Sequence, residues 1–121
     1  MKNILVVDDE LDILETIVDS LEIEFGDEVA IDKASNGNEA LELFGGDKSY
    51  DLIVTDLNMP DMDGLELTQN IKKLQVETPI IVFTGHGDIE EKEKLTALGV
   101  VAMIKKPYVE DLIDEIANTI R

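Results

Sequence analysis

Five polar side chains in this sequence stand where short apolar runs end, and they are Asp8, Asp9, Asp56, Thr84 and Lys106. An unbroken apolar run of about four residues is typical of a strand buried on both faces of a sheet. The carboxyl ends of parallel strands lie along one edge, where open α/β folds bind their ligands. Carboxylates, a hydroxyl and an ammonium group at one edge therefore predict a site for chemistry on an anion.

The three aspartates predict a bound cation. Asp8, Asp9 and Asp56 would repel one another on neighbouring strands unless a cation lay between them. Oxygen ligands without His or Cys indicate Mg²⁺, or a similar ion such as Mn²⁺. The alternative is that these acids are solvated caps, with Asp9 capping the first helix. The combination of all three favours the metal site.

Lys106 and Thr84 add groups that can bind a phosphoryl group. The ammonium of Lys106 can neutralise a carboxylate or a phosphoryl group, whereas the adjacent Lys105 keeps an ordinary surface lysine as the alternative. The Thr84 hydroxyl can donate to an anion or cap the next turn, and Gly85 leaves access open. With a divalent metal, this set is what transfer of a phosphoryl group to Asp56 requires, giving an acyl phosphate.

Alternating strands and helices must position these residues. Apolar runs predict strands at 4–7, 29–33, 51–55, 79–83 and 100–104. Helical spacing predicts helices at 11–25, 36–44, 67–74, 88–98 and 109–120. Five βα units in 121 residues predict a doubly wound (βα)5 α/β fold, a three-layer sandwich with helices on both faces of a parallel sheet.

Composition excludes several classes of function. Ten basic against 28 acidic residues give a net charge of −18, which disfavours direct binding to nucleic acid. The absence of cysteine excludes disulfides and thiolate metal sites. The first apolar run has only four residues before two acids, which is neither a signal peptide nor a membrane span, so we expect a cytoplasmic protein with no membrane partner.

The motifs resemble the receiver domain of two-component response regulators over essentially the whole chain. The residues that carry the resemblance are Asp8-Asp9, Asp56, Asn58-Met59-Pro60, Asp63-Gly64, Thr84-Gly85 and Lys106-Pro107. Their order along the chain, each at the end of an expected strand, makes the set specific. The resemblance implies one receiver domain at 1–121 with a flavodoxin-like fold and the strand order 2-1-3-4-5.

The resemblance also implies a role for each site residue. Asp56 would be the phosphoacceptor, with a histidine kinase or histidine phosphotransfer protein as the donor. Asp9, Asp56 and the backbone carbonyl of Asn58 would hold Mg²⁺ (or Mn²⁺), and Asp8 would assist through water. Lys106 would bond to the phosphoryl group.

Five positions are implied in switching or in tuning the rate of dephosphorylation. Thr84, with Gly85 after it, would move toward the phosphoryl oxygens and change the surface of the fourth helix, fifth strand and fifth helix. Met103 stands where this family usually places an aromatic residue, and its thioether can fill the same pocket. His86 and Asn58 would tune water access, so we predict that substituting His86 changes the dephosphorylation rate.

The implied protein is a signalling switch and not an enzyme, apart from its own phosphoryl transfer and slow autodephosphorylation. Its partner would be an output domain or a separate protein target. The sequence leaves open whether the chain acts alone or precedes an output domain. It also leaves open whether it is a monomer or pairs through the fourth helix, fifth strand and fifth helix.

Three other functions were weighed against this one. A flavin binder would share the fold, but the acids at 8–10 repel a phosphate unless a metal intervenes. A hydrolase of the haloacid-dehalogenase kind needs a second acid where Asn58 stands, and an amide cannot protonate a leaving group. A constitutive interaction module is the third alternative, and the complete set of acids, Thr84 and Lys106 makes a working switch the better interpretation.

Overall fold

The computed structural model describes residues 1–46, 48–74, 77–85 and 89–121, and in these residues it contains a five-stranded parallel sheet. The strands are β1 Lys2–Val7, β2 Val29–Ala34, β3 Leu52–Thr55, β4 Ile80–Thr84 and β5 Ala102–Lys105. Their order is β2-β1-β3-β4-β5, as the resemblance implied. β1 and β3 are therefore neighbours at the centre, and their carboxyl ends point to the same edge.

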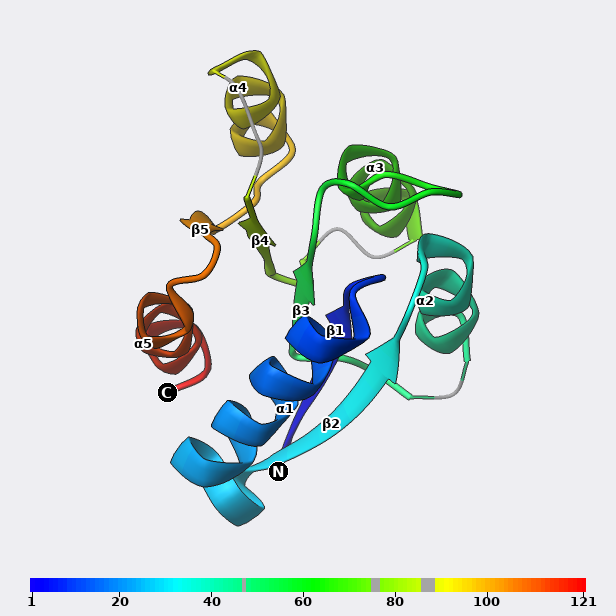
Figure 1. Cartoon of the computed structure of the whole chain (residues 1–121). Coiled ribbons are helices and arrows are strands. Elements are labelled where there is room, and N and C mark those ends of the chain that lie inside the picture. The colour runs from blue at the N-terminus through cyan, green and yellow to red at the C-terminus, as the bar shows by residue number, and fades with distance from the viewer. Residues whose placement is uncertain (47, 75–76, 86–88) are drawn as a thin grey trace.

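Helices cover both faces of the sheet (Figure 1), which confirms the doubly wound, flavodoxin-like α/β fold. The helices are α1 Leu11–Phe25, α2 Gly37–Phe44, α3 Gly64–Leu74, α4 Ile89–Ala97 and α5 Val109–Ile120, with a 3-10 turn, η1, at Gly26–Glu28. α1 and α5 pack on one face, and α2, α3 and α4 on the other.

Alternation along β1 divides the core between the two faces. Ile4 and Val6 pack with residues of α1 and α5. Leu5 and Val7 pack with residues of α2 and α3. All four side chains are buried, as expected for a central strand covered on both faces. This packing fixes the register of the strand and hence the position of the residues that follow it.

The ends of α1 and α2 have identifiable local causes. Gly26 ends α1 with a φ of 51°, a left-handed conformation that favours glycine. Asn36 begins α2, where its side chain accepts a hydrogen bond of 2.7 Å from the Glu39 N–H. The alternative in which Asp9 caps α1 is wrong, because Glu10 occupies the N-cap position and its side chain makes no capping bond.

β5 begins later than its apolar pattern predicted. The backbone N–H of Val100 still bonds to the Leu95 carbonyl at 3.0 Å, and Gly99 turns the chain with a φ of 90°. The first two valines of the expected strand therefore belong to the connection from α4. The strand itself runs over 102–105, which brings its end to the residue before Lys106.

Candidate phosphoryl-acceptor site

The three aspartates converge at the carboxyl end of the sheet, as predicted. The Asp56 N–H bonds to the Val7 carbonyl at 3.1 Å, and the Asp8 N–H bonds to the Ala34 carbonyl at 3.1 Å. These bonds continue the sheet one residue beyond β1 and β3. One carboxylate oxygen from each of Asp8, Asp9 and Asp56 then lies within 4.8 Å of the others.

Lys106 reaches into this cluster from the connection between β5 and α5. Its Nζ lies 2.9 Å from Asp8 Oδ2 and 3.1 Å from Asp56 Oδ2. It also lies 3.1 Å from Glu10 Oε1. The Lys106 N–H bonds to the Thr84 carbonyl at 2.9 Å, which anchors the lysine to the end of β4. Of the two adjacent lysines, Lys106 is therefore the one at the site.

Burial and charge pairing set the protonation of these groups. Burial raises the pKa of Asp8 above the usual aspartate value, and hydrogen bonds from the Glu10 backbone and from Lys106 offset part of the rise. Burial alone would lower the pKa of Lys106. Its hydrogen bonds to Asp8, Asp56 and Glu10 outweigh burial and raise that pKa above the usual lysine value, so the ammonium stays charged.

The backbone after β3 fixes the orientation of the Asp56 carboxylate. Its Oδ1 accepts hydrogen bonds from the Leu57 N–H at 2.7 Å and from the Asn58 N–H at 3.5 Å. Its Oδ2 faces Lys106. One oxygen is thus held by the backbone and the other by the ammonium, and the side chain is almost fully buried, with a relative exposure of 5%.

Gly64 allows the backbone at the start of α3 to pack closely against Asp56 and Leu57. Its N–H bonds to the Leu57 carbonyl at 2.8 Å, and a Cβ at this position would overlap the backbone carbonyl of Asp56. Asp63 begins α3, where its Oδ1 accepts a hydrogen bond of 2.8 Å from the Glu66 N–H. The Asp63-Gly64 pair therefore closes the turn that carries Asp56 and Asn58.

Thr84 is the last residue of β4 and lies beside the end of β5, which directly precedes Lys106. It is buried and pairs with Lys105 in the register of β4 and β5. Among the described residues, a methyl group at Gly85 would contact Lys106 Cβ alone, at 3.9 Å. The position of Thr84 agrees with the predicted site, while the switching roles of Thr84 and Gly85 stay predictions.

Met103 is half-buried and packs against a small cluster of Leu57, Val82 and Leu95. Its strand partner is Val82 in β4. Met103 therefore packs against the cluster that contains both Leu57, the residue after Asp56, and Leu95 of α4, while its switching role stays a prediction. His86 lies outside the described residues, so its predicted effect on dephosphorylation stays a prediction.

Met59 and Met62 lie in the turn between Asp56 and α3. Met59 is buried and Met62 is partly buried, and both pack in the core cluster that contains residues of α2 and α3.

One member of the site was missed by sequence reasoning. The sequence pattern marks Glu10 only as the third acid after Asp8-Asp9, yet its carboxylate contacts Lys106. The two residues are separated by 96 positions in the chain. The available signal was its place directly after the aspartate pair, on the same loop at the carboxyl edge of the sheet.

The donor set fits a divalent metal that prefers oxygen. Asp8, Asp9 and Asp56 present carboxylate oxygens close together, and the first and third of these side chains are buried. Three carboxylates this close carry more negative charge than the single ammonium of Lys106 can neutralise. Mg²⁺ binds such ligands through one or two carboxylates and keeps several waters, for which the exposed Asp9 leaves room.

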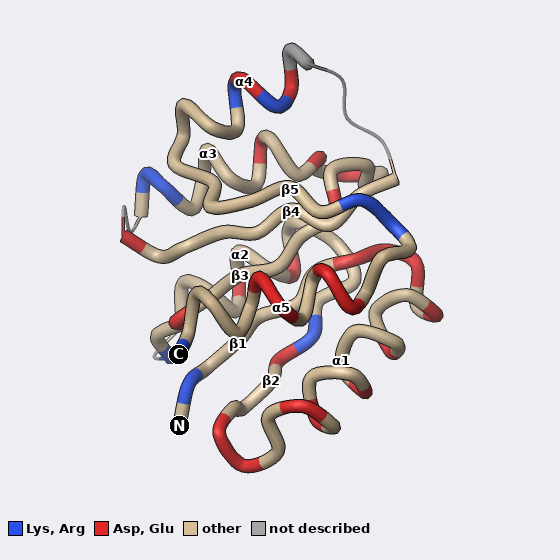
Figure 2. The backbone as a smooth tube through the Cα atoms, turned by 90° about the vertical axis from the view of Figure 1, so that its left-hand side faces the viewer, with Lys and Arg blue, Asp and Glu red and all other residues tan. Residues whose placement is uncertain are grey.

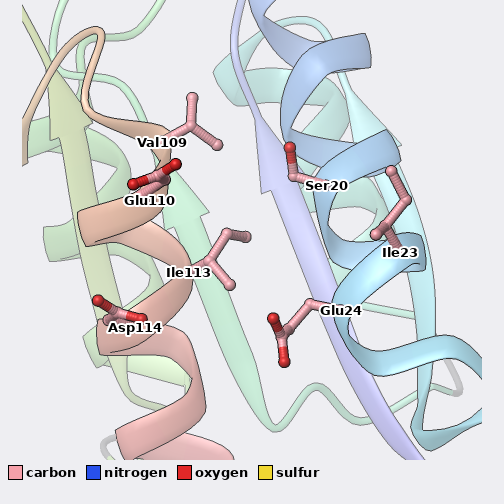
Figure 3. A pocket seen from close by; sticks show the side chains of 7 residues that line it. All are labelled: Ser20, Ile23, Glu24, Val109, Glu110, Ile113 and Asp114. Atoms are coloured by element: carbon pink, nitrogen blue, oxygen red, sulfur yellow. The ribbon is translucent and has the colours of Figure 1, made fainter.

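A separate groove of about 380 Å³ lies between α1 and α5 (Figure 3). Its lining includes Ile23 and Ile113, and its acidic side chains are Glu24, Glu110 and Asp114. None of the residues around Asp56 lines it. Among the described residues, no lysine or arginine lines the groove, so it does not suit an anionic phosphoryl group.

The fold and this edge of the sheet define a class of protein: a flavodoxin-like α/β domain with an acidic, lysine-bearing site at its switch point. Residues 4–118 match the response regulator receiver domain family, and the chain belongs to that family.

Two curated proteins that are similar in sequence carry the name of transcriptional regulators, which agrees with this family. The transcriptional regulatory protein FixJ of Rhizobium meliloti is 40% identical over 83 residues, which are 69% of this chain and 41% of FixJ. The uncharacterized transcriptional regulatory protein YesN of Bacillus subtilis is 35% identical over 113 residues, 93% of this chain and 30% of YesN. The chain therefore spans less than half the length of these curated relatives.

Solved structures agree with the fold. A response regulator receiver domain protein of Clostridium thermocellum is 34% identical with a TM-score of 0.88, and the match covers 99% of this chain and 94% of that one. The response regulator protein TrrA of Thermotoga maritima, in complex with Mg(2+)-BeF, is 32% identical with a TM-score of 0.83, and the match covers 99% and 100%. The strand order and the layers are therefore those of this family.

Proposed function

We propose that this chain is a phosphorylation-dependent signalling switch in which Asp56 accepts the phosphoryl group. Membership of the receiver family implies phosphorylation-dependent signalling in general. The choice of Asp56 rests on its place at the end of β3, between β1, whose end carries Asp8 and Asp9, and β4, which ends at Thr84. Its Oδ2 lies 3.1 Å from the Lys106 ammonium. Asp8 also has one oxygen held by a backbone N–H and the other beside Lys106, but β1 does not adjoin β4, so Asp8 is farther from Thr84 in the sheet order.

The chemistry is transfer of a phosphoryl group to a carboxylate. An oxygen of Asp56 forms a bond to phosphorus, and the bond from phosphorus to the donor breaks, so the electron pair leaves with the donor. With a phosphohistidine donor, the leaving group is the imidazole of a histidine kinase or histidine phosphotransfer protein. Lys106 stabilises the negative charge on the phosphoryl oxygens because its ammonium already lies beside Asp56.

Asp9, Asp56 and the backbone carbonyl of Asn58 would hold Mg²⁺, or Mn²⁺, with Asp8 assisting through water. The metal supplies charge neutralisation for the carboxylates and the phosphoryl oxygens. The all-oxygen donor set supports this assignment. TrrA, a relative with the same fold, is described in complex with Mg(2+)-BeF.

The output is a change in the surface of α4, β5 and α5. Thr84 and Gly85 would respond to the phosphoryl group at the end of β4, and Met103 would pass the change to α4 through Leu95. Amide chemical shifts of α4, recorded before and after phosphorylation, test this route. If the shifts change equally in the wild type and in Met103→Ala, Met103 has no part in the mechanism.

Receiver domains of response regulators interact with histidine kinases and with output domains. For this chain we propose a receiver domain over 1–121 that acts in the cytoplasm on an output domain or protein target, and pairing of two copies through α4, β5 and α5 would be compatible with that role. Direct nucleic-acid binding is not part of the proposal, given the charge of −18. None of the helices in the described part of the chain is long and apolar enough to cross a membrane.

Intact-mass spectrometry with acetyl phosphate and Mg²⁺ tests the proposal. We expect a single phosphoryl adduct on the wild type, lost when a chelator is present and absent in Asp56→Asn. Asp27→Asn is the matched control, because Asp27 is an exposed aspartate in η1 at the opposite edge of the sheet. An intact fold with no adduct would point instead to a phosphorylation-independent interaction module.

A further inference from the structure

Glu10 is the exposed member of the three carboxylates around Lys106. The Glu10 side chain has a relative exposure of 62%, whereas those of Asp8 and Asp56 have 1% and 5%. Its backbone is nevertheless fixed, since the Glu10 N–H donates to Asp8 Oδ1 at 2.9 Å. Glu10 therefore holds a negative charge at the mouth of the site, on the solvent side of the lysine.

The Glu10 carboxylate lies outside the group of acids that could share a metal. In the described residues, the acids placed to share a metal are Asp8, Asp9 and Asp56. Glu10 has Lys106 as its ion-pair partner at 3.1 Å. When a metal neutralises the aspartates, the Glu10 carboxylate stays at the entrance and competes with phosphoryl oxygens for the same ammonium.

The surrounding surface adds to this negative field. α1, which starts directly after Glu10, contains acids and no Lys or Arg, and α5 has the same composition (Figure 2). An anionic donor approaching past these helices meets Glu10 before it meets Lys106. The repulsion at that point grows with the number of negative charges on the donor.

We propose that Glu10 is a positioning residue that acts as a charge filter, disfavouring small phosphodonors in proportion to their negative charge by occupying Lys106 at the entrance. The proposal rests on the proposed function of Asp56. A phosphohistidine on a protein donor would meet the same charge, but the remaining protein interface supplies binding energy that a small anion lacks. Glu10 would thus favour protein donors over small, highly charged ones.

Two small donors of different charge make the filter measurable. At neutral pH acetyl phosphate is a dianion, whereas phosphoramidate carries one net negative charge. Each transfers its phosphoryl group to Asp56 with cleavage of its own P–O or P–N bond, releasing acetate or ammonia. Because an exposed ion pair contributes up to about 1 kcal/mol, Glu10→Gln should lower the half-saturating concentration of acetyl phosphate about three- to fivefold. The corresponding decrease for phosphoramidate should be about twofold or less.

Glu10→Asp and Asp12→Asn are the matched variants. Glu10→Asp keeps the charge at the entrance and should retain the wild-type concentration dependence. Asp12→Asn removes the same charge from the exposed first turn of α1, where no contact with Lys106 is made among the described residues. The limiting rate of Asp12→Asn should stay within about twofold of the wild-type rate, since neither the reacting carboxylate nor the contacts of Lys106 are changed.

Binding of beryllofluoride with Mg²⁺, measured by calorimetry, gives a readout without turnover. This phosphoryl mimic carries one negative charge, so Glu10→Gln should bind it up to about twofold more tightly than the wild type, as expected for phosphoramidate. High salt should reduce the difference between the two proteins.

The proposal is overturned if Glu10→Gln matches the wild type with acetyl phosphate, if both donors respond equally, or if Asp12→Asn has the same effect. Failure of the wild type to form any adduct would instead reject the proposed function itself. Thermal unfolding of each variant confirms that the comparison is made between folded proteins.

Discussion

Replacing Lys106 by methionine tests the electrostatics of the site. Methionine keeps the length of the side chain but removes the ammonium that contacts Asp8 and Asp56. Both aspartates are buried, so neither can regain full hydration when the partner is lost. We expect Lys106→Met to destabilise the protein in the absence of divalent metal.

The size of the effect follows from burial. Removing one partner of a fully buried ion pair costs about 3–5 kcal/mol. The Lys106 side chain has a relative exposure of 12%, so water can screen part of the remaining charge, and we expect a smaller loss of about 2–3 kcal/mol, at or below the lower limit of that range. The corresponding fall in the urea midpoint is about 1–2 M.

The loss should depend on pH in a defined direction. Burial already raises the pKa of Asp8, and Lys106 opposes that rise. Without Lys106 the folded-state pKa of Asp8 rises further above its unfolded value, so protonation favours the folded state. The destabilisation should therefore be full above the raised folded pKa of Asp8 and decrease as the pH falls through that pKa toward the unfolded value.

Urea unfolding followed by circular dichroism, in a chelator and then with Mg²⁺, measures the effect. Lys33→Met is the control, because Lys33 and Glu15 are both exposed and lie 4.0 Å apart, so their pair should contribute no more than about 0.5 kcal/mol. Mg²⁺ should restore more stability to Lys106→Met than to the wild type. Equal stability of the two proteins in chelator would refute the electrostatic account of this site.

Two further substitutions test other contacts of the fold, which are the hydrogen bond from Tyr50 to Asp32 and the close approach of Gly64 to the backbone of Asp56. Tyr50→Phe removes the hydrogen bond of 2.6 Å to Asp32; we expect a loss of about 1–2 kcal/mol, since the acceptor is charged. That bond lowers the pKa of Asp32, so its contribution should be present above the unfolded pKa of Asp32 and be lost as the pH falls through the folded value. Urea unfolding across this range checks the trend, and a loss independent of pH would contradict it. Gly64→Ala forces a methyl group against the Asp56 carbonyl and should cost about 1–3 kcal/mol while slowing phosphorylation. Gly46→Ala is the control, because a Cβ at this exposed glycine after α2 would lie at an ordinary contact distance of 3.4 Å from the Leu43 carbonyl oxygen.

The residues of the site could be found from sequence because each follows a strong local signal. Asp8, Asp56 and Thr84 all end buried apolar runs, and a parallel sheet places such ends on one edge. The strand order was different, since spacing alone does not say which strands are neighbours, and it came from the resemblance to a family.

What the sequence could not show depends on tertiary geometry. The contact from Glu10 to Lys106 joins two loops through side chains that could have pointed to solvent. The start of β5 depended on a turn at Gly99 that delays strand pairing. Both features are set by the path of the chain between elements, which apolar patterns do not encode.

Reduction of the phosphorylated protein with borohydride tests the central claim most directly. Borohydride converts an aspartyl phosphate to homoserine, and tandem mass spectrometry of the digested chain then locates the converted residue. If Asp56 is the phosphoacceptor, homoserine forms at position 56 alone, and only when Mg²⁺ is present during phosphorylation. Homoserine at another aspartate, with position 56 unmodified, would contradict it.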